Sequence, residues 1–455
     1  MLVNDIHSQL NRCDILDVAA VDSVDAVRAA VLRARDEQVP VAIAGGRHAM
    51  GGQQFCAGGL LIDTGSLDRI VALDAERGTI TVEAGVQWPA LLEYLAPTPW
   101  AIAQKQTGAD RLSIGGAIAA NAHGRGLTMA PLGGDLEELT LVDADGEIRR
   151  CSRDENAELF SLVIGGYGLL GVVTSATLRL APRRKVERVV EVRDLDGVAQ
   201  AFQDRIAAGF TYGDFQFAID PESSDFLHRG VFSCYRPIDD ATPIPDGQKA
   251  LSREEWGELL LLTHTDKAQA FARYSDHYLQ TNGQIYLSDA HQYGDYTDGY
   301  HTQLDVVMNA PHPATEMITE IYVPRDRLSD FMAQVADDFR ADAVDVIYGT
   351  VRLIERDEDS FLAWAREPWA CIIFNLHTVH TPAGLEHSAD AFRRLIDYAI
   401  ERGGSYFLTY HRWASGDQLE ACYPQFREFL ELKRAYDPGE RFQSDWYRHY
   451  RDALA

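Results

Sequence analysis

Apolar and polar positions follow two different periods along the first third of the chain. Residues 23–38 place apolar side chains at helical spacing behind Ser23, a residue type that caps helix N-termini, so this stretch predicts an amphipathic helix. Shorter apolar runs predict strands. In two places, a pair of these strands encloses a tight turn typical of a hairpin. The predicted strands and hairpins are residues 40–45, 59–67, 68–85 and 136–152. Helices and strands are therefore mixed up to Pro182, where a proline marks a boundary.

A different pattern runs from about residue 185 to residue 425. Segments rich in Val, Ile, Tyr and Phe alternate with amphipathic helices, which predicts an antiparallel sheet with helices on one side, an α+β fold class. The predicted strands include residues 185–195, 315–324, 343–355 and 369–380, and the predicted helices residues 327–341 and 388–403. The last part, residues 423–450, predicts a helix that ends at Asp437-Pro438-Gly439 and is followed by an aromatic tail.

The composition is that of a globular protein with an acidic surface. Of 455 residues, 46% are hydrophobic, enough to form the cores of two or three domains. The net charge of −27 repels phosphates and anionic headgroups, so neither nucleic acid nor a membrane surface is an expected partner. The N-terminus has no basic region followed by an apolar run, and the six cysteines lie far apart without C-x-x-C spacing. These features favour a cytoplasmic protein with free thiols over one with disulfides or a metal site.

Three stretches place glycines where a chain must turn sharply or approach a ligand closely. They are GGRHAMGG (45–52), SIGGAIAANAHGRG (113–126) and GGYGLLGVV (165–173). Because glycine has no Cβ, backbone N–H groups in such turns can come close to phosphate oxygens. Each stretch alone is a weak signal. The third also satisfies G-x-G-x-x-G, but a strand-like sequence follows it instead of a helix, so a dinucleotide-binding fold of the Rossmann type is not favoured.

The order and spacing of these motifs resemble the FAD-binding flavoproteins of the vanillyl-alcohol oxidase and p-cresol methylhydroxylase (PCMH) type. GGRHAMGGQQFCAGGLLIDTGSL is similar to the pyrophosphate turn of cytokinin dehydrogenases and sugar-alcohol oxidases. SIGGAIAANAHGRG is similar to the second flavin loop of the alditol and aldonolactone oxidases, the branch that the chain resembles most. LFSLVIGGYGLLGVVT resembles the closing strand of the family's cofactor domain, and the tail DPGERFQSDWYRHY resembles the end of the sugar-oxidising branch.

This resemblance implies an architecture and a cofactor. Residues 1–184 would form a PCMH-type FAD-binding domain of two α+β subdomains with extended FAD between them. Residues 185–425 would form an α+β cap domain on an antiparallel sheet, and residues 426–455 would return to the FAD domain. The residues matched to cofactor contacts are Gly45, Gly46, Arg47, His48, Ala49, Met50 and Gly51 in the first loop, Ser113, Gly115, Gly116, Asn121, Ala122, His123 and Gly124 in the second, and Gly171 and Val173 near the adenine half.

His48 matches the histidine that many family members bond to the C8α methyl group of the flavin. A neutral imidazole held against that carbon can attack it as a nucleophile. The resemblance therefore implies covalent FAD, although Arg47 and Ala49 replace the glycine and serine that commonly flank this histidine. The alternative for His48 is a hydrogen bond to the pyrophosphate, and for His123 either a cofactor contact or a structural bond within the loop.

Catalytic candidates come from the cap by the same comparison. Oxidation of a carbinol needs removal of a hydroxyl proton and positive charge near the reduced flavin. The resemblance points to Arg352 on one strand for charge, and to His377 on the next strand or His411 near the C-terminal return for the proton. The sequence departs from the branch at Thr350, where a glutamate is usual, and at Ala414, near a usual lysine.

The sequence thus predicts an FAD-dependent oxidoreductase that takes a hydride from the CH–OH group of a small sugar, alditol or lactone to flavin N5. O₂ or another acceptor would reoxidise the flavin. The cytokinin-like first loop leaves oxidation of a C–N bond as the alternative. A ligand-binding protein without turnover and a nicotinamide-dependent dehydrogenase are further alternatives, and the presence or absence of a reducible flavin decides between them.

Overall fold

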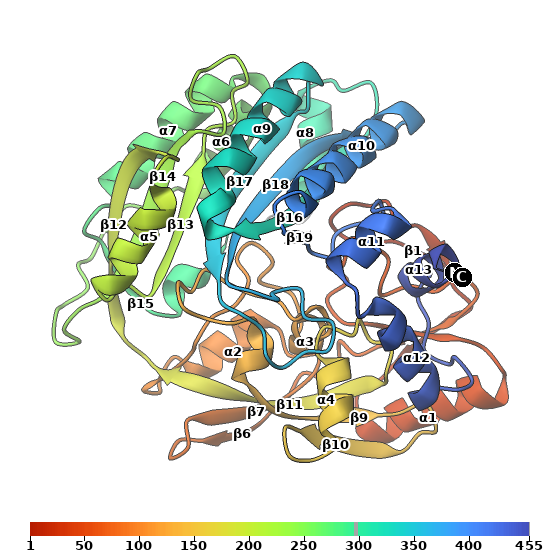
Figure 1. The fold of residues 1–455 in the computed structure, drawn as a ribbon. Coiled ribbons are helices and arrows are strands. Elements are labelled where there is room, and N and C mark those ends of the chain that lie inside the picture. Colours follow the sequence, from red (N-terminus) through yellow and green to blue (C-terminus); the bar gives the residue numbers. More distant parts are fainter. Residues whose placement is uncertain (295–298, 455) are drawn as a thin grey trace.

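The computed structural model describes residues 1–294 and 299–454 as a mixed α+β fold (Figure 1). The chain begins with two short strands, β1 (Leu2–Val3) and β2 (Cys13–Asp14). A small parallel sheet follows in the order β3-β5-β4, formed by β3 (Asp17–Ala20), β4 (Val41–Ala44) and β5 (Leu60–Asp63). Helix α1 (Val24–Asp36) covers this sheet, and its cap is Ser23, whose side chain accepts a hydrogen bond from Ala26 N. The helix and strands predicted here are confirmed.

A second, antiparallel sheet completes the N-terminal half in the order β10-β9-β11-β7-β6, with β8 paired to β11. The predicted hairpins are β6–β7 and β9–β10. The strand bounds are β6 (Ile70–Asp74), β7 (Thr79–Glu83), β8 (Trp100–Ile102), β9 (Leu136–Val142), β10 (Ile148–Ser152) and β11 (Val172–Pro182). The helices of this part are α2 (Trp88–Leu95), α3 (Ile114–Ala120), the 3₁₀ turn η1 (Leu132–Asp135) and α4 (Ala157–Val163).

The C-terminal part is built on one large sheet in the order β15-β12-β14-β13-β17-β18-β16-β19, whose paired strands are all antiparallel. Its strands are β12 (Lys185–Asp194), β13 (Tyr212–Phe217), β14 (Arg229–Pro237), β15 (Ile285–Leu287), β16 (Ala314–Pro324), β17 (Val346–Ile354), β18 (Trp369–Val379) and β19 (Ser405–Tyr406). The predicted antiparallel sheet is thus confirmed.

Helices lie on both faces of this sheet, which differs from the one-sided arrangement that the sequence predicts. One face carries α5 (Val198–Ala207), α9 (Leu328–Ala341) and α10 (Pro382–Ile400) (Figure 1). The other carries α6 (Arg253–Thr265), α7 (Lys267–Gln280) and α8 (Tyr300–Val307). Leu259, 6% exposed, is the one buried residue of α6, a helix that borders a cavity. Short 3₁₀ turns are η2 (Ala290–Gln292) and η3 (Arg325–Arg327).

The last segment returns to the N-terminal half through α11 (Gly416–Cys422), α12 (Phe426–Tyr436) and α13 (Asp445–Ala453). The predicted aromatic tail is therefore largely a helix. Val41 N donates to Arg441 O (2.7 Å) and Gln443 N donates to Val41 O (2.9 Å), so this segment adds to the edge of the parallel sheet. Trp446 is fully buried and packs against Tyr167, with ring centroids 4.6 Å apart.

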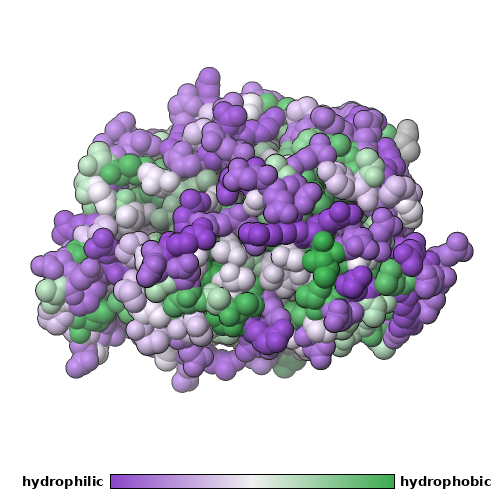
Figure 2. All heavy atoms as spheres, turned by 90° about the horizontal axis from the view of Figure 1, so that it is seen from below, coloured by the Kyte–Doolittle hydropathy of each residue, from purple (hydrophilic) through white to green (hydrophobic). Residues whose placement is uncertain are grey.

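The surface agrees with the acidic composition. Figure 2 shows the molecule from below the view of Figure 1, and most of this face is hydrophilic, with hydrophobic residues in small separate groups. No helix within residues 1–294 and 299–454 combines the length and apolarity needed to cross a membrane. All six cysteines are buried free thiols.

Candidate functional site

A cavity of about 1300 Å³ lies between the glycine-rich loops of the N-terminal half and the large sheet. Most small-molecule sites enclose about 300–1000 Å³, so this one has room for a large cofactor together with a small ligand. Its wall combines residues 45–50, parts of 106–125 and 167–173, and several positions of β13, β16, β17 and β18. Helices α6 and α7 cover it from the side of the sheet opposite to α9 and α10.

The first glycine turn, residues 45–52, borders this cavity with backbone atoms that no side chain covers. A Cβ atom added to Gly45 would overlap Oγ of Ser113, and one added to Gly46 would lie 2.5 Å from the carbonyl oxygen of Arg111. Side chains are therefore excluded where the two loops touch. The backbone of Gly45 and Gly46 faces the cavity as a result, with no side chain between it and a ligand.

Arg47 occupies the left-handed region of backbone conformation, with φ of +57°. This region suits glycine, the residue that the related loops commonly carry at this point, and it strains other residues by about 1 kcal/mol or more. The side chain of Arg47 compensates through an ion pair between its Nη2 and Oδ2 of Asp63, 2.7 Å apart. The turn thus keeps its shape despite the substitution.

His48 follows in the turn and contacts a second histidine. Its Nδ1 lies 2.6 Å from Nε2 of His7, and both rings line the cavity. Burial, reinforced by the neighbouring His48, lowers the pKa of His7 to about 3, so His7 is neutral at pH 7. In such a pair one nitrogen donates and the other accepts, which fixes the orientation of the His48 ring. The sequence motifs did not reveal His7, which lies 41 residues before His48.

The second glycine stretch, residues 113–126, contains the whole of helix α3. Oγ of Ser113 accepts from Gly116 N (3.2 Å) and caps this helix. Asn121 ends the helix with φ of +47°, and its side chain donates to Oδ2 of Asp357 (2.8 Å) and accepts from Gly133 N (2.9 Å). Ser113 and Asn121 therefore hold the loop in shape and do not line the cavity, whereas Gly115, Gly116, Ala122 and His123 do.

Near the end of this stretch, His123 meets a buried carboxylate from the large sheet. Its Nε2 lies 2.6 Å from Oε2 of Glu320, which also accepts from the hydroxyl of Tyr322 (3.0 Å). The hydroxyl of Tyr410 donates to Oε1 of Glu320 (2.6 Å). Burial alone would raise the pKa of Glu320, but the charge and hydrogen bond of His123 and the bond from Tyr410 hold it at about 2. Glu320 is therefore an ionised carboxylate on the cavity wall.

Glu320 and Tyr410 were not among the catalytic candidates from the sequence. The signal for Glu320 was present, because Glu316, Ile318 and Glu320 alternate along β16 on the face that lines the cavity. A strand with two carboxylates on one face of an otherwise apolar run requires partners for those charges. The sequence could not show where the partners come from, since His123 lies 197 residues away.

Arg352 lies on β17 and faces the same cavity with 6% of its surface exposed. Its Nη2 donates to Oγ1 of Thr107, a residue of the loop before α3. Within residues 1–294 and 299–454, Nε of Arg352 has no hydrogen-bond partner although it is buried. A buried guanidinium with donors left over is suited to binding an oxygen-rich or anionic ligand.

The two histidine candidates of the cap lie elsewhere. His411 is 2% exposed and stacks on Phe392 with ring centroids 4.5 Å apart, and its Nε2 lies 3.2 Å from Oγ1 of Thr319. Burial lowers its pKa to about 3. His377 lies on the cavity-facing side of β18, two residues beyond Asn375, and contacts Glu316 instead of the cavity. The structure thus brings Arg352 to the cavity, but neither His377 nor His411.

Most of the residues matched to cofactor contacts do reach the cavity. Those that line it are Gly45, Gly46, Arg47, His48, Ala49, Met50, Gly115, Gly116, Ala122, His123, Gly171 and Val173. Those that do not are Gly51, Ser113, Asn121 and Gly124. Gly171 has φ of +148°, a conformation that L side chains rarely adopt, and a Cβ there would lie 2.8 Å from the carbonyl oxygen of Val142. The backbone conformation at position 171 and its close neighbours therefore require glycine there.

Comparisons with known proteins agree on the N-terminal half. Residues 16–152 match the family model described as FAD binding domain. The chain is 26% identical over 394 residues to L-gulono-1,4-lactone dehydrogenase of Mycobacterium tuberculosis, which covers 86% of each chain. It is 31% identical over 161 residues to L-gulonolactone oxidase of Mus musculus, or 35% of this chain and 36% of the relative.

A third relative comes from a plant. Cytokinin dehydrogenase 4 of Oryza sativa is 22% identical over 466 residues, covering 94% of this chain and 85% of the relative. These matches, together with the glycine turns that border one large cavity, support the family that the loop motifs indicate. The chain is an FAD-dependent oxidoreductase with an FAD binding domain in its N-terminal half, and it is similar to flavoproteins of the vanillyl-alcohol oxidase and p-cresol methylhydroxylase type.

Proposed function

We propose that this oxidoreductase acts on the CH–OH group of a small polar substrate, such as a sugar, alditol or lactone. The observation that carries the proposal is one cavity that holds both the bare glycine backbone and the polar group of Arg352, Glu320 and Tyr410. The similarity to proteins named L-gulono-1,4-lactone dehydrogenase and L-gulonolactone oxidase supports the same substrate class.

The residues of the N-terminal half fit FAD. A cofactor with a pyrophosphate needs backbone N–H groups that a phosphate oxygen can approach, and the turn at Gly45 and Gly46 and the start of α3 at Gly115 and Gly116 meet that need. The adenine side would lie near Gly171 and Val173. When bound, the flavin supplies the chemistry of accepting a hydride from the substrate carbon. Residues 1–184 would then act as the cofactor domain, 185–425 as the cap and 426–455 as the returning segment.

His48 is proposed to attach the flavin covalently. The contact from His7 supports this role, because it holds an oriented imidazole at the cavity wall. A neutral ring nitrogen is the form that can act as a nucleophile. Acid precipitation tests the bond: a yellow pellet, with an intact mass raised by that of FAD, is expected, and a colourless pellet of apoprotein mass would exclude it.

Arg352 would bind substrate oxygen atoms. Its buried guanidinium offers donors toward the cavity, and a planar guanidinium can hold two oxygens at once. It would thereby orient the carbon that is oxidised and stabilise negative charge in its surroundings.

Tyr410 and Glu320 would take the hydroxyl proton. As the substrate carbon loses a hydride, its hydroxyl becomes a protonated carbonyl, which is a strong acid. Its proton would pass to the oxygen of Tyr410, while the proton of Tyr410 passes to Oε1 of Glu320 along the existing 2.6 Å hydrogen bond. A weakly basic carboxylate suffices for so strong an acid. His123 would hold Glu320 in place throughout.

Anaerobic spectroscopy tests the substrate class. We expect L-gulono-1,4-lactone or an alditol to bleach the flavin absorbance, and an N6-substituted adenine to leave it unchanged.

The second candidate is oxidation of a C–N bond, which the similarity to cytokinin dehydrogenase 4 over 94% of the chain favours. Bleaching by the adenine alone would replace our proposal with that candidate. Mixing the reduced protein with O₂ then shows whether O₂ or another acceptor reoxidises it.

A further inference from the structure

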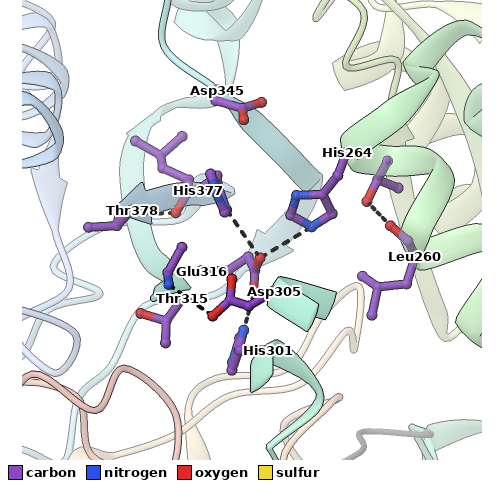
Figure 3. A network of polar contacts seen from close by, with 12 residues as sticks. Leu260, His264, His301, Asp305, Thr315, Glu316, Asp345, His377 and Thr378 are labelled. Carbon is purple, nitrogen blue, oxygen red and sulfur yellow. Dashed lines mark hydrogen bonds and ion pairs between the residues drawn. The ribbon is translucent and has the colours of Figure 1, made fainter. Parts of the chain in front are cut away.

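Three side chains from distant parts of the sequence converge beside the cavity, at one end of the large sheet. They are His264 at the end of α6, Glu316 on β16 and His377 on β18 (Figure 3). One potential ligand atom from each lies within 4.8 Å of the others. The side chain of His264 is 1% exposed, that of Glu316 is 4% and that of His377 is 19%.

Both imidazoles point at the same oxygen of the carboxylate. Nε2 of His264 lies 3.3 Å from Oε1 of Glu316, and Nδ1 of His377 lies 3.7 Å from it. Hydrogen bonds from N–H to oxygen usually measure about 2.7–3.2 Å, so these separations are too long for two good ones. Neither nitrogen has another hydrogen-bond partner among residues 1–294 and 299–454, although both are buried.

The separations of 3.3 and 3.7 Å are close to the spacing of ligands around a metal ion. Zinc binds imidazole nitrogen and carboxylate oxygen at about 2.0–2.2 Å in tetrahedral geometry, which places neighbouring ligand atoms about 3.3–3.5 Å apart. The rings of His264 and His377 are also nearly perpendicular, with centroids 5.0 Å apart, so they approach the shared oxygen from different directions. Two histidines and one carboxylate are a common donor set for zinc with one position left for water.

The other oxygen of Glu316 has partners of its own on α8. Oε2 lies 2.6 Å from Nδ1 of His301 and accepts a hydrogen bond from the hydroxyl of Tyr300, both on α8. Such contacts orient a ligating carboxylate and leave its remaining oxygen for the metal. The cluster therefore has the two layers of a built site: three candidate ligands and a support for the acidic one.

We propose that His264, Glu316 and His377 bind one divalent transition-metal ion, with Zn²⁺ the ion that suits this donor set and spacing. The fourth position would hold water. Because Glu316 itself lines the cavity, the ion would lie at the cavity wall. The cysteine pattern of the sequence gave no sign of this site, since its ligands are histidines and a glutamate separated by 52 and 61 residues.

Metal titration of the full-length, flavin-loaded protein tests the proposal. The protein is stripped with a chelator, desalted, and titrated with Zn²⁺ by calorimetry, and the bound metal is counted by elemental analysis. We expect one ion per chain. With Co²⁺ as the probe, we expect the visible bands of a four- or five-coordinate ion at wavelengths longer than the flavin absorbance.

Three variants and one control locate the ion. H264Q and H377Q should weaken Zn²⁺ binding by more than the 10- to 100-fold that loss of a supporting residue costs, and H301Q by about 10- to 100-fold. The control is His387→Gln, which removes a histidine whose side chain is 43% exposed and should leave binding unchanged. Each variant is first checked for its flavin spectrum and circular dichroism.

The effect of Zn²⁺ on the thermal midpoint is a second measurement, which keeps the proposal testable if one of the variants fails to fold. Zn²⁺ should raise the thermal midpoint of the wild-type protein, because binding to the native state alone stabilises it, and it should leave that of H377Q unchanged. The proposal is overturned if the stripped protein takes up no stoichiometric Zn²⁺, or if H264Q and H377Q bind it as tightly as wild type. In that event the cluster is a network of histidines around a carboxylate without a metal.

Discussion

His123 Nε2 and Glu320 Oε2 lie 2.6 Å apart, and this contact joins the second glycine loop to the large sheet at the wall of the cavity. Both groups are buried, so the loop and the sheet hold a charge that neither could hold alone. The polar end of the cavity is thus a product of the contact between the two halves of the protein.

Glu320→Gln tests the role of this carboxylate. The amide keeps the shape of the side chain but cannot take a proton from Tyr410, so turnover should fall by about 10²-fold or more with a smaller change in KM. Tyr410→Phe should have a similar effect, and the double variant should be no worse than the poorer single one. Steady-state kinetics with the substrate that bleaches the flavin provide the measurement. Glu358→Gln, an exposed position, is the control, and near-normal turnover of E320Q would remove the carboxylate from the mechanism.

Arg352→Gln tests substrate binding. Loss of a charge-assisted hydrogen bond costs about 1.5–3 kcal/mol, which corresponds to a decrease in kcat/KM of roughly 10- to 150-fold. Arg352→Lys should recover only part of this, because an ammonium group lacks the planar fork of a guanidinium. Equal kcat/KM values for R352Q and wild type would show that the guanidinium does not contact the substrate.

His7→Phe tests the covalent bond at His48. Without its 2.6 Å contact, the His48 ring loses its fixed orientation, so the covalently bound fraction of FAD should fall while total flavin decreases less. His48→Ala should abolish the covalent fraction. Intact mass and the fluorescence of denatured protein on a gel give both quantities. A fully covalent H7F protein would show that His7 does not contribute to attachment.

Asp135→Asn tests a buried acid that lies outside the site. Burial raises the pKa of Asp135 to about 6 from its ordinary 3.8, against the attraction of Arg179 and Arg153. Its folded pKa exceeds its unfolded pKa, so the protein should lose stability as the pH rises from about 4 to 6, by up to about 3 kcal/mol. The asparagine variant stays neutral at both pH values. Its melting temperature should therefore be higher than that of wild type at pH 7 and equal to that of wild type at pH 4. Parallel melting curves at the two pH values decide this, and an equal difference at both would contradict it.

The sequence predicts best what depends on neighbours in the chain. Glycine spacing located the turn at residues 45–52 and the close approach of backbone at residues 113–126, because a backbone without Cβ is a local requirement, but it gave no sign that Ile114–Ala120 forms helix α3. Runs rich in Val, Ile, Tyr and Phe located β12, β16, β17 and β18 of the large sheet for the same reason, whereas β13, β14, β15 and β19 were not among the predicted strands. Helix α6 was missed, since it borders a cavity and so lacks the strong apolar stripe of a packed helix.

Residue roles that depend on contacts across the fold could not be predicted in this way. His411 and Tyr410 are adjacent in the sequence, yet only Tyr410 reaches the cavity, because His411 turns to stack on Phe392 of α10. His7 and Glu320 acquire their roles from partners 41 and 197 residues away. The cavity exists only in the folded chain, so no local pattern of residues shows which loop side chains point into it.

The returning C-terminal segment sets a limit on when the protein can mature. Phe442 completes the core beneath the parallel sheet, and Trp446 covers Tyr167, so the N-terminal half lacks part of its interior until these residues have left the ribosome. Folding from the N-terminus during synthesis therefore cannot finish the cofactor site ahead of the cap. A chain truncated before Phe442 should therefore lack part of the interior of the parallel sheet and bind FAD less tightly than one that includes it.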